Sequence, residues 1–362
     1  MVIARDRVTK PMRILQVSQM YPPFFGGLEE HVRNVSEHLA IDHDVTVITT
    51  DPSGRLPKEE TINGVLVRRF NGFAPQNSYY VSLGMLLELR KAAYDIVHAY
   101  NYHAFPAFFS RYATRERLIV TPFYHGHGSS MLRDHLLKVY KPLGKKIFQE
   151  ADKVIALSKH EKSLLIEDFE MVDEEITVIP SGINMTEFSK LEKTNKKSKV
   201  ILYVGRLEEY KGVQHILQAL PMLDEEVRLE IVGSGPYKKS LANLVEQLGI
   251  EERIKFYQGL PRDELLRRYV SADLLVMLSK YESFAIVIAE ALAAKTPCLV
   301  ANTSALSEWI DNENCFGIDY PINIDRLASS VNEIIGRQVS RVELWDWGKV
   351  AKATIEIYKE EG

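Results

Sequence analysis

Two glutamates with an apolar segment between them are the residues of this sequence best placed to do chemistry. Glu282 and Glu290 lie eight positions apart, and the residues between them are small or apolar. An α-helix rises about 1.5 Å and turns about 100° per residue, so eight residues separate the carboxylates by about 12 Å and rotate them by roughly 80°. Both side chains can therefore face one cleft, at a spacing that matches a sugar joined to a nucleoside diphosphate.

The start of the same helix predicts a phosphate site between the two acids. If Ser283 is the N-cap and the helix starts near Phe284, the backbone N–H groups of the first turn have no partner within the helix. These groups and the helix dipole favour a bound anion. The alternative interpretation is a buried helix with a surface acid at each end. The residues expected to line the phosphate site are Ser283, Phe284, Ala285, Ile286 and Val287.

Two cations and a glycine pair lie where further phosphate contacts are expected. Arg206 follows the strand-like run 200–204, and Lys211 comes five residues later. Both can reach one diphosphate at the carboxyl edge of a sheet, although two unrelated surface cations would give the same pattern. Gly26 and Gly27 follow the first strand-like run, so the backbone there can approach an anion or form a plain tight turn.

Length and composition limit the class of protein. At 362 residues the chain suits two domains, and 46% hydrophobic residues can fill two cores. A net charge of −4 gives no general case for nucleic-acid binding, and 2 cysteines do not make a disulfide framework. Residues 1–12 lack the apolar stretch of a signal peptide, and no run of about 18 apolar residues predicts a transmembrane helix. We expect a cytoplasmic protein.

Short runs rich in apolar residues alternate with helical patterns along the chain. Strands that are apolar nearly throughout, separated by helix-length segments, predict parallel sheets covered on both faces. A charged run without core residues, at 190–199, separates two series of strands and predicts a linker. The expected fold class is therefore α/β, with two Rossmann-like, doubly wound domains that face a cleft. The predicted strands are 13–18, 44–49, 65–70, 95–99, 118–123 and 153–157 in the first domain and 200–204, 229–232, 254–257, 274–278 and 297–301 in the second.

Several segments of the chain, in this order, resemble glycosyltransferase family 4. Members of that family have the GT-B fold and transfer sugars from nucleotide sugars with retention of configuration and without a metal. The similar segments are Gly26-Gly27-x-Glu29, 178–184, Gly205-Arg206 with Lys211-Gly212, 232–236 and Glu282-x7-Glu290. The resemblance extends from residue 13 to about residue 358. It implies an acceptor-binding domain at 1–188, a linker at 189–199, a nucleotide-sugar-binding domain at 200–342 and a C-terminal helix at 343–362 that crosses back to the first domain.

The resemblance also assigns residues to the diphosphate of the donor. Arg206 and Lys211 would bind it, and Gly27 would approach it from the opposite wall. Positive charge from the cations and the helix amides would then replace a metal ion on the leaving group. We therefore expect no metal and no cofactor beyond the nucleotide sugar itself.

Other residues are assigned by the resemblance to the two ends of the donor. Glu290 would bind the ribose hydroxyls, and Glu282 would bind the hydroxyls of the transferred sugar. The backbone at Gly259 and Leu260 would meet the base. Uridine is slightly preferred over guanosine or adenosine as the expected nucleoside, although no side chain selects the base.

Five positions depart from the family pattern. Ala285, Lys295 and the pair Ser304-Ala305 stand where the family usually has glycine, and Phe123 stands in the register where it commonly has histidine. A residue with a side chain adopts positive φ less readily than glycine. These departures affect the expected geometry of the donor site.

Histidines near the run 118–123 are the remaining catalytic candidates. His125 or His127 is expected to take the sugar-contacting role, and we favour His125. His98, at the end of another strand, would line the acceptor cleft or be a core histidine. The His-x-His spacing also allows zinc, but no cysteine or carboxylate stands at a suitable spacing.

Residues 138–146 form a basic amphipathic segment, interrupted by Pro142 and Gly144. Such a face can lie on an anionic membrane, or it can be a solvated helix that covers the first domain. Peripheral contact with the inner face of a membrane is therefore one expectation. The lysines of this segment are Lys138, Lys141, Lys145 and Lys146.

The sequence thus predicts a retaining glycosyltransferase that moves a hexose from a nucleoside-diphosphate sugar to a sugar, lipid or other hydroxyl acceptor, with cell-envelope glycans as the expected products. Front-face attack, in which the leaving phosphate takes the acceptor's proton, fits the residues better than a covalent double displacement. Glu282 would orient the sugar, and His125 would position or stabilise it. The alternatives are a nucleotide-sugar 2-epimerase on the same fold and a non-catalytic nucleotide-sugar-binding protein.

Overall fold

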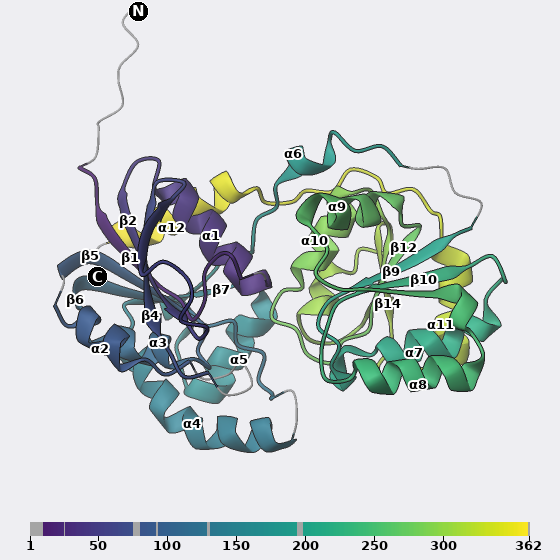
Figure 1. Ribbon diagram of the computed structural model, residues 1–362, viewed down its shortest axis with the longest axis horizontal. Helices are drawn as coiled ribbons and strands as arrows, with labels where there is room; N and C mark the ends of the chain where they lie inside the picture. Colours follow the sequence, from purple (N-terminus) through teal and green to yellow (C-terminus); the bar gives the residue numbers. More distant parts are fainter. Residues whose placement is uncertain are drawn as a thin grey trace, which may run out of the picture.

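The structure of the chain, a computed structural model, describes residues 10–24, 26–74, 80–91, 93–128, 131–193 and 198–360, without the side chains of 131–134 and 136. Two β-sheets stand side by side, each with helices on both faces (Figure 1). Each sheet is the centre of one domain. The doubly wound α/β fold expected from the alternation of strands and helices is confirmed.

Eight strands form the first sheet within the described ranges. Their spatial order is β3-β4-β2-β1-β5-β6-β7-β8, and each pair is parallel except β3 with β4. The strands are β1 (Arg13–Val17), β2 (Asp44–Asp51), β3 (Glu59–Ile62), β4 (Val65–Asn71), β5 (Ala93–Tyr100), β6 (Thr114–Thr121), β7 (Lys153–Ala156) and β8 (Ile176–Val178).

The second sheet is parallel throughout its described strands. Its spatial order is β11-β10-β9-β12-β13-β14. The strands are β9 (Val200–Val204), β10 (Arg228–Val232), β11 (Ile254–Tyr257), β12 (Leu274–Met277), β13 (Cys298–Ala301) and β14 (Cys315–Ile318).

Helices connect the strands and cover both sheets. Those around the first sheet are α1 (Gly27–Leu39), α2 (Leu83–Leu89), α3 (Phe105–Phe109), α4 (Met131–Glu150), α5 (Lys159–Phe169) and α12 (Trp347–Lys359). Those around the second sheet are α6 (Met185–Phe188), α7 (Val213–Ala219), α8 (Lys238–Leu248), α9 (Arg262–Ser271), α10 (Ile286–Ala293) and α11 (Ile324–Ile334), with the short 3-10 helix η7 (Ser304–Trp309) before β14.

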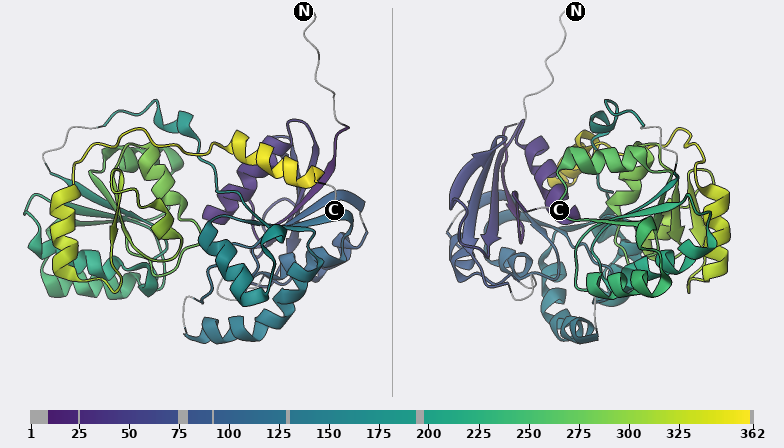
Figure 2. Two further views of the ribbon diagram at one scale, coloured as in Figure 1. Left: turned by 180° about the vertical axis from the view of Figure 1, so that it is seen from behind. Right: turned by 45° about the vertical axis from the view of Figure 1, so that its right-hand side comes forward.

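The central strands are buried on both faces. In β1, Leu15 packs into the core with α2, α3 and α4, whereas Ile14 packs into the core with α1 and α12. In β9, Tyr203 and Leu202 enter two different cores in the same way. Figure 2 shows from two further directions that α1 (purple) and α12 (yellow) lie together, away from α4 (teal). This two-sided burial explains why the central strands are continuous apolar runs in the sequence.

Three strands lie outside the predicted set, and all three are at sheet edges. β3, β8 and β14 each have one strand neighbour. In β3 exposed and half-buried residues alternate, so this strand has no continuous apolar run. An edge strand covered on one side carries a weaker apolar signal than a central strand.

The basic segment of the first domain belongs to an unbroken helix, contrary to the predicted interruption. α4 continues through Pro142 and Gly144. A Cβ added to Gly144 would lie 2.0 Å from the ring of Tyr102, so glycine is needed for the helix to pack this closely. Gly144, where a break in the helix was expected, is instead the position at which α4 packs closely against Tyr102.

The chain passes between the domains at two neighbouring segments. The Ile183 N–H donates a hydrogen bond of 2.8 Å to the Trp345 carbonyl. A Cβ added to Gly182 would lie 2.8 Å from Trp347, which shows how closely the two segments approach. Ile183 and α6 already belong to the core of the second domain. The crossing therefore precedes α6, whereas the expected linker at 189–199 follows it.

The last helix returns to the first domain. α12 lies against α1, although α11 before it covers the second sheet (Figure 1). Gln16 donates a hydrogen bond of 3.2 Å to the Tyr358 hydroxyl, and Arg117 donates one of 2.9 Å to the Ile357 carbonyl. These contacts attach the end of the chain to β1 and β6.

The strand orders determine where a ligand can bind. In the first sheet β1 lies between β2 and β5, and in the second sheet β9 lies between β10 and β12. At such a switch point the loops after the two central strands diverge to opposite faces and leave a crevice. The loops after β1, β5, β9 and β12 are therefore expected to supply the site.

Candidate active site

A cavity of about 200 Å³ lies between the two domains at the ends of the central strands, and we call it the cleft cavity. The structure brings several of the predicted residues to it from distant parts of the sequence. Its lining residues are Gly27, Leu28, Phe123, Leu157 and Ser181 from the first domain and Val204, Gly205, Lys211, Met277, Glu282, Ser283, Phe284, Ala285, Ile286 and Val287 from the second.

The helix between the two glutamates begins later than predicted. α10 starts at Ile286 and its N-cap is Ala285, so Ser283 is not the cap. No side chain caps this end. The first-turn N–H groups of Ile286 and Val287, which line the cleft cavity, therefore retain their capacity to bind an anion.

Three residues that stand at expected glycine positions adopt left-handed backbone conformations. Their φ angles are 66° at Ala285, 60° at Lys295 and 48° at Ser304. Each such conformation costs about 1–3 kcal/mol for a residue with a side chain. At Ser304 the side chain gains a contact, because its hydroxyl accepts a hydrogen bond of 3.1 Å from the Glu282 N–H. The serine thus fixes the backbone of Glu282.

A buried ion pair lies at the cleft cavity. The Lys211 Nζ is 2.6 Å from the Glu282 Oε1, and the two side chains are 12% and 13% exposed. Burial lowers the pKa of Lys211, but Glu282 and Tyr210 raise it more, so the ammonium group stays charged. Gly212 has φ 74°, and a Cβ there would lie 2.4 Å from the Leu278 carbonyl oxygen. Glycine therefore allows the backbone next to Lys211 to pack against the end of β12.

Arg206 lies at the open side of this site. Its side chain is 62% exposed and donates a hydrogen bond of 2.9 Å to Glu208. The two predicted diphosphate ligands therefore differ in exposure, because the Lys211 side chain is only 12% exposed.

Glu29 occupies the N-terminus of α1, where Gly27 was expected to approach phosphate. Burial raises the pKa of Glu29, while its own N–H, Gln19 and the nearby Arg206 oppose that shift. A Cβ added to Gly26 would lie 2.3 Å from the Glu29 carboxylate, so the side chain folds back over the start of the helix. Gly27 lines the cleft cavity, but an anion there also faces this carboxylate.

Glu290 is not among the residues that line the cleft cavity, whereas Glu282 is. One carboxylate oxygen accepts from Arg262, and the other accepts a hydrogen bond of 2.7 Å from the Tyr269 hydroxyl. Arg262 also bonds to Glu187 at 2.8 Å. The helical spacing assumed between the two acids does not hold, because α10 begins at Ile286 and Glu282 precedes it. The sequence also gave no sign that a neighbouring helix supplies partners to the Glu290 carboxylate.

The residues expected to meet the base lie next to this cluster. Gly259 is exposed with φ 64°, and Leu260 packs on the core of the second domain. Arg262 follows them at the start of α9. Neither Gly259 nor Leu260 lines the cleft cavity.

A buried glutamate holds the loop that contains the candidate histidines. Glu161 of α5 accepts hydrogen bonds from the N–H groups of Tyr124 and Leu157. Ser158 is the N-cap of α5 and accepts from the Glu161 N–H at 3.0 Å. The Ser-x-x-Glu spacing is a capping-box signal that the sequence contained. Burial raises the pKa of Glu161 to about 8.

His125 lies near the ion pair and has a free ring nitrogen. Burial and the Lys211 charge lower the pKa of His125 to about 4, although Glu282 partly opposes this shift. Its Nδ1 is buried and has no hydrogen-bond partner in the described part of the protein. A neutral imidazole in this position can bind a hydroxyl group of a ligand.

His103, which the sequence analysis did not select, lies beside His125. Their ring centroids are 5.6 Å apart, and both ring nitrogens of His103 are buried without a partner among the residues described. Burial lowers the pKa of His103 to about 3. The sequence could have indicated His103 as a site residue, because it lies just after β5, a strand at the switch point of the first sheet.

The other two histidines have different surroundings. His98 is a core residue: its Nδ1 lies 2.7 Å from the Tyr358 hydroxyl and its Nε2 lies 2.8 Å from the Thr121 hydroxyl. Of the two predicted surroundings of His98, the acceptor cleft and the core, the structure shows the core. His127 stacks on Tyr281 of the second domain, with ring centroids 4.0 Å apart.

Glu308 of η7 joins the domains at the start of α5. Its carboxylate accepts hydrogen bonds from the N–H groups of Lys159 (3.1 Å) and His160 (2.6 Å). A carboxylate at a helix N-terminus is favoured by the helix dipole. No sequence signal indicated that this contact crosses between domains.

The described residues offer neither a metal-binding cluster nor a membrane-spanning helix. They contain no group of three or more His, Cys, Asp or Glu side chains suited to a metal ion. No helix among them is long and apolar enough to cross a membrane.

Comparison with known proteins gives two family matches that meet at the domain crossing. Residues 25–187 match Glycosyltransferase Family 4, and residues 184–349 match Glycosyl transferases group 1. An uncharacterized glycosyltransferase of Methanocaldococcus jannaschii is 31% identical, over 96% of this chain and 98% of its own. The glycogen synthase of Mycobacterium tuberculosis is 29% identical, over 96% of this chain and 94% of its own.

Solved structures share the fold. The sucrose-phosphate synthase of Thermosynechococcus elongatus superposes with a TM-score of 0.80 at 21% identity, over 96% of this chain and 98% of that one. Anabaena HepE in complex with UDP and glucose has a TM-score of 0.74 at 19% identity, over 96% of this chain and 99% of that one.

Glu161→Gln should remove the contribution of the Glu161 carboxyl to the pH dependence of the free energy of unfolding. Since the folded pKa is about 8 and the ordinary value is 4.5, the folded protein keeps a proton that the unfolded chain releases between these values. The stabilisation of the folded protein by this proton is fully present below about pH 4.5 and is lost as the pH rises through about 8. Urea unfolding between about pH 5 and pH 9 should therefore show wild-type stability falling relative to that of Glu161→Gln. Parallel curves for the two proteins would contradict the buried, protonated carboxyl.

Proposed function

Because this chain belongs to the glycosyltransferases of family 4 and has the GT-B fold, we propose that it transfers a hexose from a nucleoside-diphosphate sugar to a hydroxyl acceptor with retention of configuration. The observation that carries this proposal is the Lys211–Glu282 ion pair beside the uncapped start of α10. A fixed cation, free N–H groups and a carboxylate acceptor then lie around one small cavity. These are the groups that a diphosphate and an attached sugar require.

The donor would lie along the second domain. Its diphosphate would meet Lys211 and the N–H groups of Ile286 and Val287, and the exposed Arg206 would close over it. Its sugar would face Glu282 and His125. The exposed guanidinium and the buried ammonium would together neutralise the leaving group, without a metal ion.

The nucleoside would extend toward Gly259 and Leu260. A ribose hydroxyl would share the Glu290 carboxylate with Arg262 and Tyr269, since each oxygen accepts one bond and keeps a lone pair. Alternatively it would replace Arg262, whose guanidinium would keep its contact with Glu187. The base would meet the backbone of the exposed Gly259 rather than a side chain. UDP is the preferred nucleotide of the proposal, and the complex of the similarly folded Anabaena HepE with UDP supports it.

The mechanism proposed is front-face displacement. The bond from the sugar's anomeric carbon to the diphosphate oxygen breaks, the acceptor oxygen bonds to the same face of that carbon, and the acceptor's proton passes to the departing phosphate oxygen. Glu282 would hold the sugar hydroxyls while the ring gains positive charge. His125 would position the sugar through hydrogen bonding, since its lowered pKa keeps the imidazole neutral at pH 7.

Peripheral contact with an anionic membrane on the cytoplasmic side is a second element of the proposal. The outer face of α4 exposes 64% of Val139 and 40% of Leu143. Lys141 and Lys145, however, form ion pairs with Asp168 and Glu170. Lys138 and Lys146 would therefore carry most of the attraction to lipid.

Release of nucleoside diphosphate from a panel of UDP-, GDP- and ADP-sugars tests the proposed function. In the presence of EDTA, slow release into water from one donor should be seen, because the cations and amides supply the field that a metal would give. Isomerised donor would instead support a 2-epimerase, and binding without reaction would support a non-catalytic protein. Loss of activity in EDTA with recovery in Mg²⁺ or Mn²⁺ would contradict the metal-free mechanism.

Arg206→Ala should weaken binding of the nucleoside diphosphate by about ten- to a hundredfold and leave binding of the bare nucleoside nearly unchanged. Hydrogen bonds to a charged group contribute about 1.5–3 kcal/mol each. Calorimetric titration of both ligands provides the measurement. Arg326→Ala is a matched control, because Arg326 is also exposed and paired with one carboxylate, Asp319, on the surface. An equal loss for both ligands in Arg206→Ala would show that this cation does not meet the diphosphate.

A further inference from the structure

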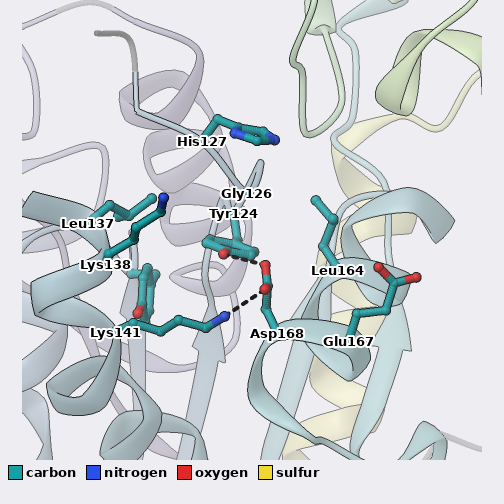
Figure 3. Close-up of a pocket in the computed structure, with 10 residues that line it drawn as sticks. Tyr124, Gly126, His127, Leu137, Lys138, Lys141, Leu164, Glu167 and Asp168 are labelled. Atoms are coloured by element: carbon teal, nitrogen blue, oxygen red, sulfur yellow. Dashed lines mark hydrogen bonds and ion pairs between the residues drawn. The ribbon is translucent and has the colours of Figure 1, made fainter. Parts of the chain in front are cut away.

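A second cavity, of about 350 Å³, lies in the first domain between α4 and α5 (Figure 3). Figure 3 shows Leu137, Lys138 and Lys141 on one wall, Leu164, Glu167 and Asp168 on the other, and His127 above them. Its volume falls in the range of about 300–1,000 Å³ that is usual for small-molecule sites. Its lining residues are Tyr102, Tyr124, Gly126, His127, Leu137, Lys138, Lys141, Leu164, Glu167 and Asp168.

An ordered polar group lies on the wall of the second cavity. The Asp168 carboxylate accepts hydrogen bonds of 2.6 Å from the Tyr124 hydroxyl and of 2.6 Å from the Lys141 Nζ. Burial raises the pKa of Asp168, but Lys141 and Tyr124 lower it more, so the carboxyl is ionised. Each oxygen accepts one of these bonds and has a lone pair left for a ligand hydroxyl.

The opposite charges of the second cavity are arranged on separate walls. Lys138 of α4 has no ion-pair partner among the residues with described side chains, and Glu167 of α5 is exposed on the facing helix. Leu137 and Leu164 add apolar surface between them. A ligand with an anionic group at one end and hydroxyls at the other matches this pattern.

The second cavity and the cleft cavity share one wall, the loop 123–127. Phe123 lines the cleft cavity, whereas Tyr124, Gly126 and His127 line the second cavity. His127 also stacks on Tyr281, the residue that precedes Glu282. A molecule in the second cavity is therefore next to the place proposed for the transferred sugar.

We propose that the second cavity is the acceptor subsite and that it binds a phosphorylated monosaccharide or polyol. The phosphate would pair with Lys138, with His127 beside it, and ring hydroxyls would donate to Asp168 and Glu167. The apolar face of the ring would lie on Leu164. This inference rests on the proposed function, because the bound molecule supplies the hydroxyl that attacks the anomeric carbon and loses its proton to the departing diphosphate.

Binding of glucose 6-phosphate to the full-length protein, measured by calorimetry, tests this subsite. Lys138→Ser should weaken binding by about tenfold or more, since a charge-assisted contact is lost. Lys352→Ser is the matched control, because Lys352 is an exposed lysine of α12, outside the second cavity and outside the basic segment of α4, and it should leave binding unchanged. Glucose without phosphate should bind at least about tenfold more weakly than glucose 6-phosphate.

Leu164→Trp gives a second variant that alters no charge. The indole would fill the second cavity and abolish binding of glucose 6-phosphate, while the affinity for nucleoside diphosphate stays as in the wild type. The same variant separates two sources of the ligand. Binding to phosphatidylinositol vesicles but not to phosphatidylcholine vesicles, lost in Leu164→Trp, identifies a lipid headgroup, and binding of glucose 6-phosphate alone identifies a soluble acceptor.

Two results would overturn the subsite. One is the absence of binding of both glucose 6-phosphate and phosphatidylinositol vesicles by the wild type. The other is binding of glucose 6-phosphate that Lys138→Ser and Lys352→Ser change equally. Failure of the wild type to bind any nucleoside diphosphate would refute the proposed function instead, and this measurement is independent of the second cavity.

Discussion

The buried ion pair between Lys211 and Glu282 is the interaction on which the geometry of the cleft depends. Removal of two charges from water costs several kcal/mol per ion, and a buried pair persists only where its geometry and surrounding hydrogen bonds are good. Here the Ser304 hydroxyl holds the backbone of Glu282, and Gly212 packs the backbone next to Lys211 against Leu278. The pair therefore fixes a positive charge and a hydroxyl acceptor at the junction of the two sheets.

Residues with strained backbone conformations cluster around the Lys211–Glu282 ion pair. Phe123, Ala285 and Ser304 all have positive φ, and each lies at the cleft cavity or bonds to a residue that does. Such conformations are kept where the surrounding packing determines them strongly. At Phe123 the ring packs edge-on against His31 with centroids 5.4 Å apart, and Glu161 holds the next N–H group. Tertiary packing thus maintains backbone conformations at the cleft that these residues would not adopt by their own conformational preferences.

The sequence predicted what depends on local pattern. The central strands are continuous apolar runs because both of their faces are buried, and Gly27, Lys211 and Glu282 follow the strands that form the switch points. Properties set by distant contacts were not predictable in the same way. Arg262, on another helix, donates a hydrogen bond to the Glu290 carboxylate, and Glu308 accepts a hydrogen bond from α5 across the domain boundary. The left-handed start of α10 moved its cap from Ser283 to Ala285, which no propensity for serine at an N-cap could show.

The most direct test of this account is the chemical step of Glu282→Gln with a nucleotide sugar that the wild type uses. The glutamine keeps the shape of the side chain but leaves the Lys211 charge unpaired until a diphosphate arrives. Affinity for the nucleoside diphosphate should therefore be unchanged or higher, while the single-turnover rate of its release from the nucleotide sugar falls by at least about tenfold. A loss of nucleoside diphosphate affinity with an unchanged single-turnover rate would contradict the assignment of Glu282 to the sugar and Lys211 to the leaving group.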